Sequence, residues 1–175
     1  MKKIYITGVS GVGKTTTGEA LEKIGFHYID LDRDQDRITR WKNKESGEIS
    51  HWQPGIGLDF FKNNNYICEK EKLIQLMNEY TGENPIVVIG LTDNQSELLD
   101  LFDTVFLLHC DENIFIKRII DRTNNDFGKH ESEQNMILKW YKDFEKEMID
   151  KGAIPINTDK TTDEVVNEII KNINN

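Results

Sequence analysis

Short apolar runs recur along the chain and are separated by longer segments of mixed polarity. Five such runs occur, at residues 3–7, 26–29, 85–90, 104–108 and 153–156. The first, third and fourth are rich in β-branched residues and almost free of charge, a pattern typical of parallel strands buried on both faces. Pro155 places the last run at an edge of the sheet, because proline cannot donate to a neighbouring strand.

The segments between these runs carry apolar residues at the three-to-four-residue spacing of helices. Helices are expected over about residues 15–24, 96–101, 112–120, 132–151 and 162–173. Asp111 and Thr161 stand where capping residues precede helices. The alternation of strands and helices predicts an α/β domain in which helices cover both faces of a parallel sheet.

Residues 33–80 are harder to interpret, because they are polar and interrupted by a turn-forming cluster at residues 51–57. Leu73, Leu76 and Met77 give one part of this segment a helical apolar face. We therefore expect a helical insertion between the second and third strands of the sheet. Trp41 and Trp52 could line a ligand pocket there or pack against other apolar side chains.

The first strand leads directly into the sequence Gly-Val-Ser-Gly-Val-Gly-Lys-Thr at residues 8–15, which matches the phosphate-binding loop G-x-x-x-x-G-K-[ST]. Its glycines leave the backbone free to turn its N–H groups around a phosphate at the start of the following helix. Lys14 would reach the β- and γ-phosphates, and the Thr15 hydroxyl would bind Mg²⁺. The predicted nucleotide-binding residues are Gly8, Val9, Ser10, Gly11, Val12, Gly13, Lys14, Thr15 and Thr16.

Two acidic residues, Asp30 and Asp32, follow the second strand. In open α/β sheets, ligands bind beyond the carboxyl ends of the strands, so both carboxylates are candidates for the active site. Asp32 could also serve as the N-cap of a following helix. The sequence leaves open which of the two lies near the metal.

Composition narrows the class of molecule that the protein is expected to bind. The chain has 22 basic and 31 acidic residues, a net charge of −9 that is unlike the basic footprint of nucleic-acid-binding domains. Cys68 and Cys110 do not form a C-x-x-C pair, which argues against a zinc site. No apolar run reaches the length of a membrane span or a signal peptide. We expect a cytoplasmic protein, a monomer or homodimer, that acts on a small molecule.

Other phosphate-loop classes fit less well. A motor-type ATPase needs an acidic residue at the end of an apolar strand to hold magnesium, but the clearest strand ends at Ile89 and Gly90. A GTPase would carry an Asn-Lys-x-Asp motif, whereas residues 157–160 read Asn-Thr-Asp-Lys.

With the phosphate-binding loop, the order of elements resembles the P-loop kinases of small metabolites and nucleotides, a group that includes adenylate, shikimate and gluconate kinases. The resemblance covers essentially the whole chain, but only residues 8–15 match sharply. It implies the three-layer P-loop NTPase fold, with a five-stranded parallel sheet, an acceptor-binding insertion at residues 33–80 and a lid at residues 122–132. The Gly-Gly-Gly that shikimate kinases carry after the third strand is missing, so no single member of the group is indicated.

The resemblance also implies roles for individual residues. Asp30 or Asp32 would sit near Mg²⁺ and the acceptor hydroxyl, and Arg118 and Arg122 would clamp the triphosphate. The loop at residues 157–160 would lie against adenine. Guanidinium groups suit anionic acceptors, so Arg37 and Arg40 join Asp32 as candidates for acceptor binding, although a basic run is more often a solvated helix face. The predicted catalytic residues are Lys14, Asp32, Arg118 and Arg122.

The sequence thus predicts an ATP- and Mg²⁺-dependent phosphotransferase that moves a γ-phosphoryl group to a small metabolite or nucleotide. The alternative is an ATP-binding regulatory or adaptor ATPase that acts through a protein partner.

Overall fold

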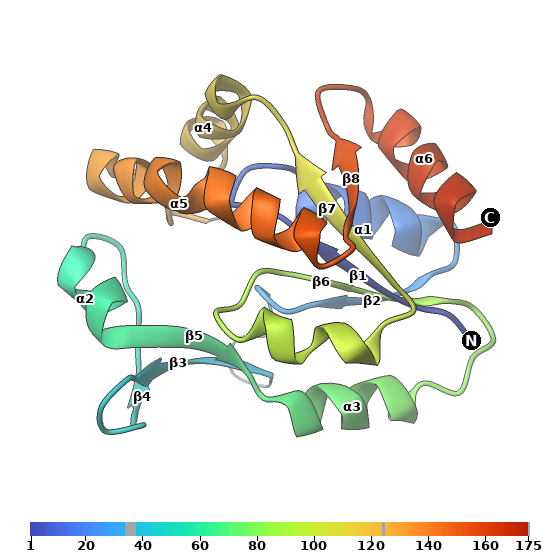
Figure 1. Ribbon diagram of the computed structural model, residues 1–175, viewed down its shortest axis with the longest axis horizontal. Helices are drawn as coiled ribbons and strands as arrows, with labels where there is room; N and C mark the ends of the chain where they lie inside the picture. Colours follow the sequence, from blue (N-terminus) through green and yellow to red (C-terminus); the bar gives the residue numbers. More distant parts are fainter. Residues whose placement is uncertain (34–37, 124, 175) are drawn as a thin grey trace.

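The protein, described by a computed structural model over residues 1–33, 38–123 and 125–174, is built around a five-stranded sheet (Figure 1). The strand order is β2-β6-β1-β7-β8, and every pairing in it is parallel. The strands are β1 (Lys3–Thr7), β2 (His27–Asp30), β6 (Ile86–Ile89), β7 (Thr104–His109) and β8 (Ile154–Asn157). β8, which contains Pro155, lies at an edge as predicted.

The central strands are buried because they are apolar on both faces. All four residues of β6 are buried, and so are Ile4, Tyr5 and Ile6 of β1. Alternate side chains of these strands feed two separate hydrophobic clusters, one on each face of the sheet. The α/β fold with a five-stranded parallel sheet, predicted from the sequence, is confirmed.

Helices cover both faces of this sheet. One face packs against α1, α4, α5 and α6, and the other against α3 and two 3₁₀ turns (Figure 1). The helices are α1 (Lys14–Lys23), α2 (Leu58–Asn63), α3 (Lys70–Glu79), α4 (Glu112–Asp121), α5 (Glu131–Asp150) and α6 (Thr162–Asn174). Asp111 caps α4 by accepting a hydrogen bond from the Asn113 amide, as its position predicted.

The prediction that residues 33–80 form a wholly helical insertion is wrong. The segment contains a second sheet of antiparallel strands, β3 (Thr39–Asn43), β4 (Ile49–Ser50) and β5 (Asn64–Cys68), in the order β4-β3-β5. Trp41 of β3 faces Tyr66 of β5 in the register. Pairing with β5 along the whole length of β3 outweighs the low β propensity of Lys42 and Asn43.

Two helix predictions also need correction. Residues 96–101 do not form one continuous helix, because two short 3₁₀ helices, Gln95–Glu97 and Leu99–Leu101, stand there. In α5, the four-residue spacing of Met136, Trp140, Phe144 and Met148 predicts a stripe that packs on the core. Phe144 and Met148 are buried, but Met136 and Trp140 are only half-buried. The buried stripe instead follows a mixed three-and-four spacing and consists of Glu133, Ile137, Tyr141, Phe144 and Met148.

Within the described residues, no helix combines the length and the apolar composition that a membrane crossing requires.

Gly18 in α1 permits a close contact that shapes the end of β2. A Cβ at this position would lie 2.3 Å from Cε2 of the Tyr28 ring. In an ordinary helix interior, replacing glycine with alanine stabilises a protein by about 1 kcal/mol. Here we expect Gly18→Ala to lower the free energy of unfolding by about 1–3 kcal/mol, because the Tyr28 ring must move. Urea denaturation measures the change.

The control for this prediction is the same substitution in a Tyr28→Ala background. With the ring removed, Gly18→Ala should be neutral or stabilising, since only helix propensity remains. If Gly18→Ala stabilises the wild-type chain as well, the contact with Tyr28 does not constrain α1.

Candidate active site

The phosphate-binding loop joins β1 to α1 and needs glycine at two crowded positions. A Cβ on Gly8 would lie 2.4 Å from the carbonyl oxygen of Leu108, and one on Gly11 would lie 2.5 Å from that of Phe115. Both glycines have positive φ angles, 150° and 87°. The loop is therefore pressed against β7 and α4, and its shape depends on residues without side chains.

The amino end of α1 is open toward a cavity. Its N-cap is Gly13, with φ of 99°, and in the described part of the chain no side chain caps it. The first amide groups of a helix have no partner within the helix and carry partial positive charge, so they favour a phosphate. Seven of the nine predicted nucleotide-binding residues line this cavity: Ser10, Gly11, Val12, Gly13, Lys14, Thr15 and Thr16.

The other two, Gly8 and Val9, lie behind the cavity and hold the loop lysine. Lys14 is only 8% exposed, and its Nζ donates hydrogen bonds to the carbonyl oxygens of Gly8 at 2.8 Å and Val9 at 3.2 Å. Nζ also lies 3.9 Å from Oδ2 of Asp32. Burial lowers the pKa of Lys14 from its usual value, and the charge of Asp32 opposes this shift.

Both carboxylate oxygens of Asp30 accept hydrogen bonds from groups within the protein. Its Oδ2 accepts hydrogen bonds from the Tyr28 hydroxyl at 2.6 Å and from the Thr15 hydroxyl at 3.4 Å. Its Oδ1 accepts from the backbone amides of Asp32 at 2.9 Å and Arg33 at 3.3 Å. Asp30 thus ties the end of β2 to the start of α1 and leaves only 4% of its side chain exposed.

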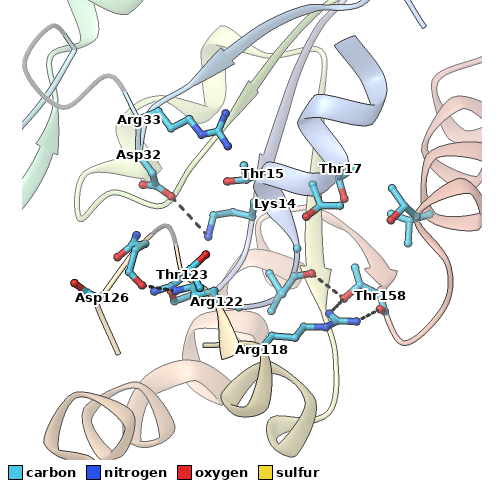
Figure 2. A pocket seen from close by; sticks show the side chains of 18 of the residues that line it. Lys14, Thr15, Thr17, Asp32, Arg33, Arg118, Arg122, Thr123, Asp126 and Thr158 are labelled. Carbon is cyan, nitrogen blue, oxygen red and sulfur yellow. Dashed lines mark hydrogen bonds and ion pairs between the residues drawn. The ribbon is translucent and has the colours of Figure 1, made fainter. Parts of the chain in front are cut away.

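Asp32 faces the cavity instead. Figure 2 shows its carboxylate pointing toward Lys14, and 34% of its side chain remains exposed. Burial among the surrounding groups raises the pKa of Asp32 above its usual range, and the charge of Lys14 opposes this rise. The structure therefore separates the two carboxylates: Asp30 lies beside Thr15, and Asp32 lies across from Lys14.

Arg118 lies on the other side of the loop and is joined to the segment after β8. Its guanidinium donates to Oγ1 of Thr158 at 3.2 Å and to the carbonyl oxygen of Thr158 at 2.8 Å (Figure 2). The Thr158 hydroxyl in turn donates to the carbonyl oxygen of Val12 at 2.8 Å. Thr158 was not singled out from the sequence, although it falls in the loop expected near adenine.

Arg122 stands at the end of α4 and is held by the segment that follows. Its Nε donates to the carbonyl oxygen of Asn125 at 3.0 Å, and its NH2 group donates to that of Phe127. Burial lowers the pKa of Arg122, and the charge of Asp32 opposes this shift. Since both of its described partners are neutral carbonyls, its positive charge is available to a ligand in the cavity.

The cavity enclosed by these groups has a volume of about 920 Å³, a size typical of small-ligand sites. Beyond the residues already described, its lining includes Thr17, Arg33, Trp52, Thr123, Asn125, Asp126, Lys160, Thr162 and Val165. Arg33 was missed from the sequence, although its position directly after Asp32 was a signal.

Arg37 and Arg40 were also predicted to bind the acceptor. Arg37 falls outside the described residues. Arg40 is not part of the cavity lining described here, and its Nε lies 3.4 Å from a carboxylate oxygen of Glu69.

The residues present fit a nucleotide with a magnesium ion. The Thr15 hydroxyl and the Asp30 carboxylate are hard oxygen donors held 3.4 Å apart beside the open end of α1. Mg²⁺ in kinases is bound by one or two such groups together with phosphate oxygens and water. The glycine-lined loop and Lys14 offer the donors that a triphosphate requires.

Comparison with known proteins finds one matching family model and several similar kinases. The family model described as "AAA domain" (AAA_18) matches residues 4–139. A shikimate kinase of Bacillus cereus (strain AH187) is 25% identical over 179 residues, which cover 99% of both chains.

Two solved structures have the same fold. A shikimate kinase from Bacteroides thetaiotaomicron has a TM-score of 0.63 at 16% identity, covering 99% of each chain. A gluconokinase from Sinorhizobium meliloti 1021 has a TM-score of 0.56 at 21% identity, covering 99% of this chain and 91% of that one. The resemblance to P-loop small-molecule kinases is confirmed, and the chain belongs to the AAA domain family AAA_18.

Proposed function

We propose that the protein is an ATP- and Mg²⁺-dependent phosphotransferase that moves the γ-phosphoryl group to a hydroxyl of a small metabolite or nucleotide. The observation that carries this proposal is the ion pair in the cavity lining between Asp32 and Lys14, with the Asp32 carboxylate 3.9 Å from Nζ. A nucleotide-binding loop alone would suit any P-loop protein. A carboxylate facing the loop lysine adds a group that can hold an acceptor where the γ-phosphate would lie.

Each part of the cavity then has a role. The amides at the start of α1 and Lys14 would hold the phosphate oxygens, and the Thr15 hydroxyl, which donates to Asp30, would hold the metal. When bound, ATP supplies the transferred group and Mg²⁺ neutralises charge on its phosphates. Asp32 orients the acceptor hydroxyl and accepts its proton as the new oxygen–phosphorus bond forms, while the bond between the γ-phosphorus and the bridging oxygen breaks and ADP leaves.

The two arginines act on the nucleotide from different sides. Arg118 and Thr158 brace the loop where the adenine end would lie, and Arg122 brings positive charge over the transferred group. In this proposal residues 1–175 form one kinase domain, residues 33–80 receive the acceptor and residues 122–132 act as the lid. Closure of such a lid would exclude water and so favour transfer over hydrolysis.

The experiment that tests the proposal measures ADP release from ATP and Mg²⁺ in the presence of different acceptors. Nucleosides, nucleoside monophosphates, sugar acids and shikimate-like hydroxy acids make up the panel. Acceleration by one class supports the kinase. Tight ATP binding with slow hydrolysis that no acceptor changes would contradict it and favour the regulatory alternative.

Replacing the loop lysine tests the nucleotide side of the site. We expect Lys14→Ala to lower kcat by about 10²-fold or more, because it removes a charge aimed at the phosphates. The exposed Lys23 at the end of α1 provides the control, and Lys23→Ala should retain full activity. Steady-state kinetics and circular dichroism on both variants make the comparison. Unchanged turnover in a folded Lys14→Ala protein would rule out the proposed role of Lys14.

The raised pKa of Asp32 predicts the pH dependence of the reaction. A protonated Asp32 cannot accept a proton, so kcat/KM should rise with pH through the pKa of this group. Because burial raises that pKa, the acidic limb should lie above the ordinary aspartate value of 3.8. Asp32→Asn should lower kcat/KM by about 10²-fold or more and remove the limb. A limb that persists in Asp32→Asn would belong to another group.

A further inference from the structure

A continuous row of aromatic rings joins the inserted sheet to the proposed lid. Trp41 of β3 contacts Phe61 of α2 with ring centroids 5.6 Å apart, and Phe61 contacts Phe127 at 5.7 Å. Phe127 in turn meets Trp52 edge to face, at 6.1 Å and 74°. We call these four residues the aromatic bridge. Figure 1 shows the same arrangement at the level of elements, with α2 lying beneath the amino end of α5.

The aromatic bridge reaches the active site through Trp52, which belongs to the cavity lining with Asp32 and Arg122. Trp52 Nε1 is buried and has no hydrogen-bond partner in the described part of the chain, so a donor remains at this wall for an oxygen atom of a ligand. The acceptor side of the cavity therefore offers an aromatic surface, one indole N–H group and one carboxylate.

The basic residues on this side are already paired with carboxylates. Arg33 NH2 lies 2.6 Å from Glu19, and its Nε lies 3.6 Å from Asp30. Figure 2 shows Arg33 extending toward α1, away from the path of Asp32 toward Lys14. On the inserted sheet, Arg40 and Lys42 both face Glu69, at 3.4 and 3.5 Å.

The remaining described cations of the cavity lining are Lys14, Arg118, Arg122 and Lys160. Lys14 belongs to the phosphate-binding loop, Arg118 is bound to Thr158, Arg122 is held by the lid, and Lys160 is paired with Glu168. Lys14 and Arg122, the two cations whose charges act on Asp32, are assigned to the phosphates of the nucleotide. A carboxylate or phosphate on the acceptor would therefore stand near Asp32 without a further described cation to neutralise it. Burying an unpaired charge beside a like charge is unfavourable. An uncharged ring packed on Trp52 carries no such cost, and its hydroxyls can bind Asp32 and the indole N–H.

We propose that the phosphoryl acceptor is an uncharged ring that carries hydroxyl groups, either a carbohydrate or a nucleoside, and that it packs against Trp52 with one hydroxyl at Asp32. This inference rests on the proposed kinase function. It departs from what the name of the similar shikimate kinase suggests, because shikimate carries a carboxylate.

Matched pairs of acceptors that differ in charge test this inference. ADP release is measured with glucose against glucuronate, adenosine against adenosine monophosphate, and shikimate methyl ester against shikimate. We expect the neutral member of at least one pair to accelerate ADP release at least tenfold over the charged member. The first two pairs distinguish a carbohydrate from a nucleoside acceptor.

Variants of Trp52 test whether the acceptor packs against this side chain. Trp52→Leu should raise KM for the neutral acceptor about tenfold and leave KM for ATP unchanged, while Trp52→Phe should retain most of the affinity because an aromatic face remains. The control is Trp140→Leu, since Trp140 packs against Phe144 on α5 and is not part of the cavity lining. This control should leave both KM values unchanged.

The outcomes separate the two proposals. Acceleration by glucuronate, adenosine monophosphate or shikimate above that by their neutral partners overturns the acceptor class and leaves the kinase function standing. An unchanged KM for the acceptor in a folded Trp52→Leu protein overturns the role of Trp52. If no acceptor changes ADP release, and Lys14→Ala does not change it either, the kinase function itself fails.

Discussion

The Asp30 carboxylate, almost fully buried at the end of β2, accepts hydrogen bonds on both of its oxygens and fixes the geometry around it. The Tyr28 hydroxyl holds it from its own strand, the Asp32 amide holds it from the turn that follows, and the Thr15 hydroxyl links it to α1. These contacts turn the chain sharply after β2, so that the next carboxylate, Asp32, points back toward Lys14. Gly18 supports the position of Asp30 indirectly. Only a residue without a side chain at this position lets Tyr28, a hydrogen-bond partner of Asp30, lie against α1.

The opposite side of the phosphate-binding loop is held by Thr158. Its hydroxyl donates to Val12 and accepts from Arg118, and its amide donates to His109 at the end of β7. Asp30 and Thr158 therefore secure the loop from two different edges of the sheet. With both sides held, Lys14 can bond to the carbonyls of its own loop and still present its charge to the cavity. Preorganisation of this kind costs no rearrangement when charge develops during transfer.

The sequence was sufficient to predict the sheet, because its strands are apolar on both faces and separated by long segments with helical periodicity. The sequence was also sufficient to predict the phosphate-binding loop, because the spacing of its glycines and its lysine follows from the shape of a phosphate. It could not rank Asp30 against Asp32, since the difference lies in contacts with Tyr28 and Thr15 that only the folded chain brings together. The inserted sheet was missed because β3 and β5 contain charged or amide residues that disfavour strands locally.

The inserted sheet gives the aromatic side of the site a rigidity that isolated helices would not. Trp41 is fixed by pairing between β3 and β5, and its contacts with Phe61 carry that rigidity to Phe127. Phe127 holds Arg122 through its carbonyl oxygen and meets Trp52 through its ring. Phe127 thus directly connects Trp52, on the proposed acceptor side of the cavity, with Arg122, the arginine proposed to lie over the transferred phosphate.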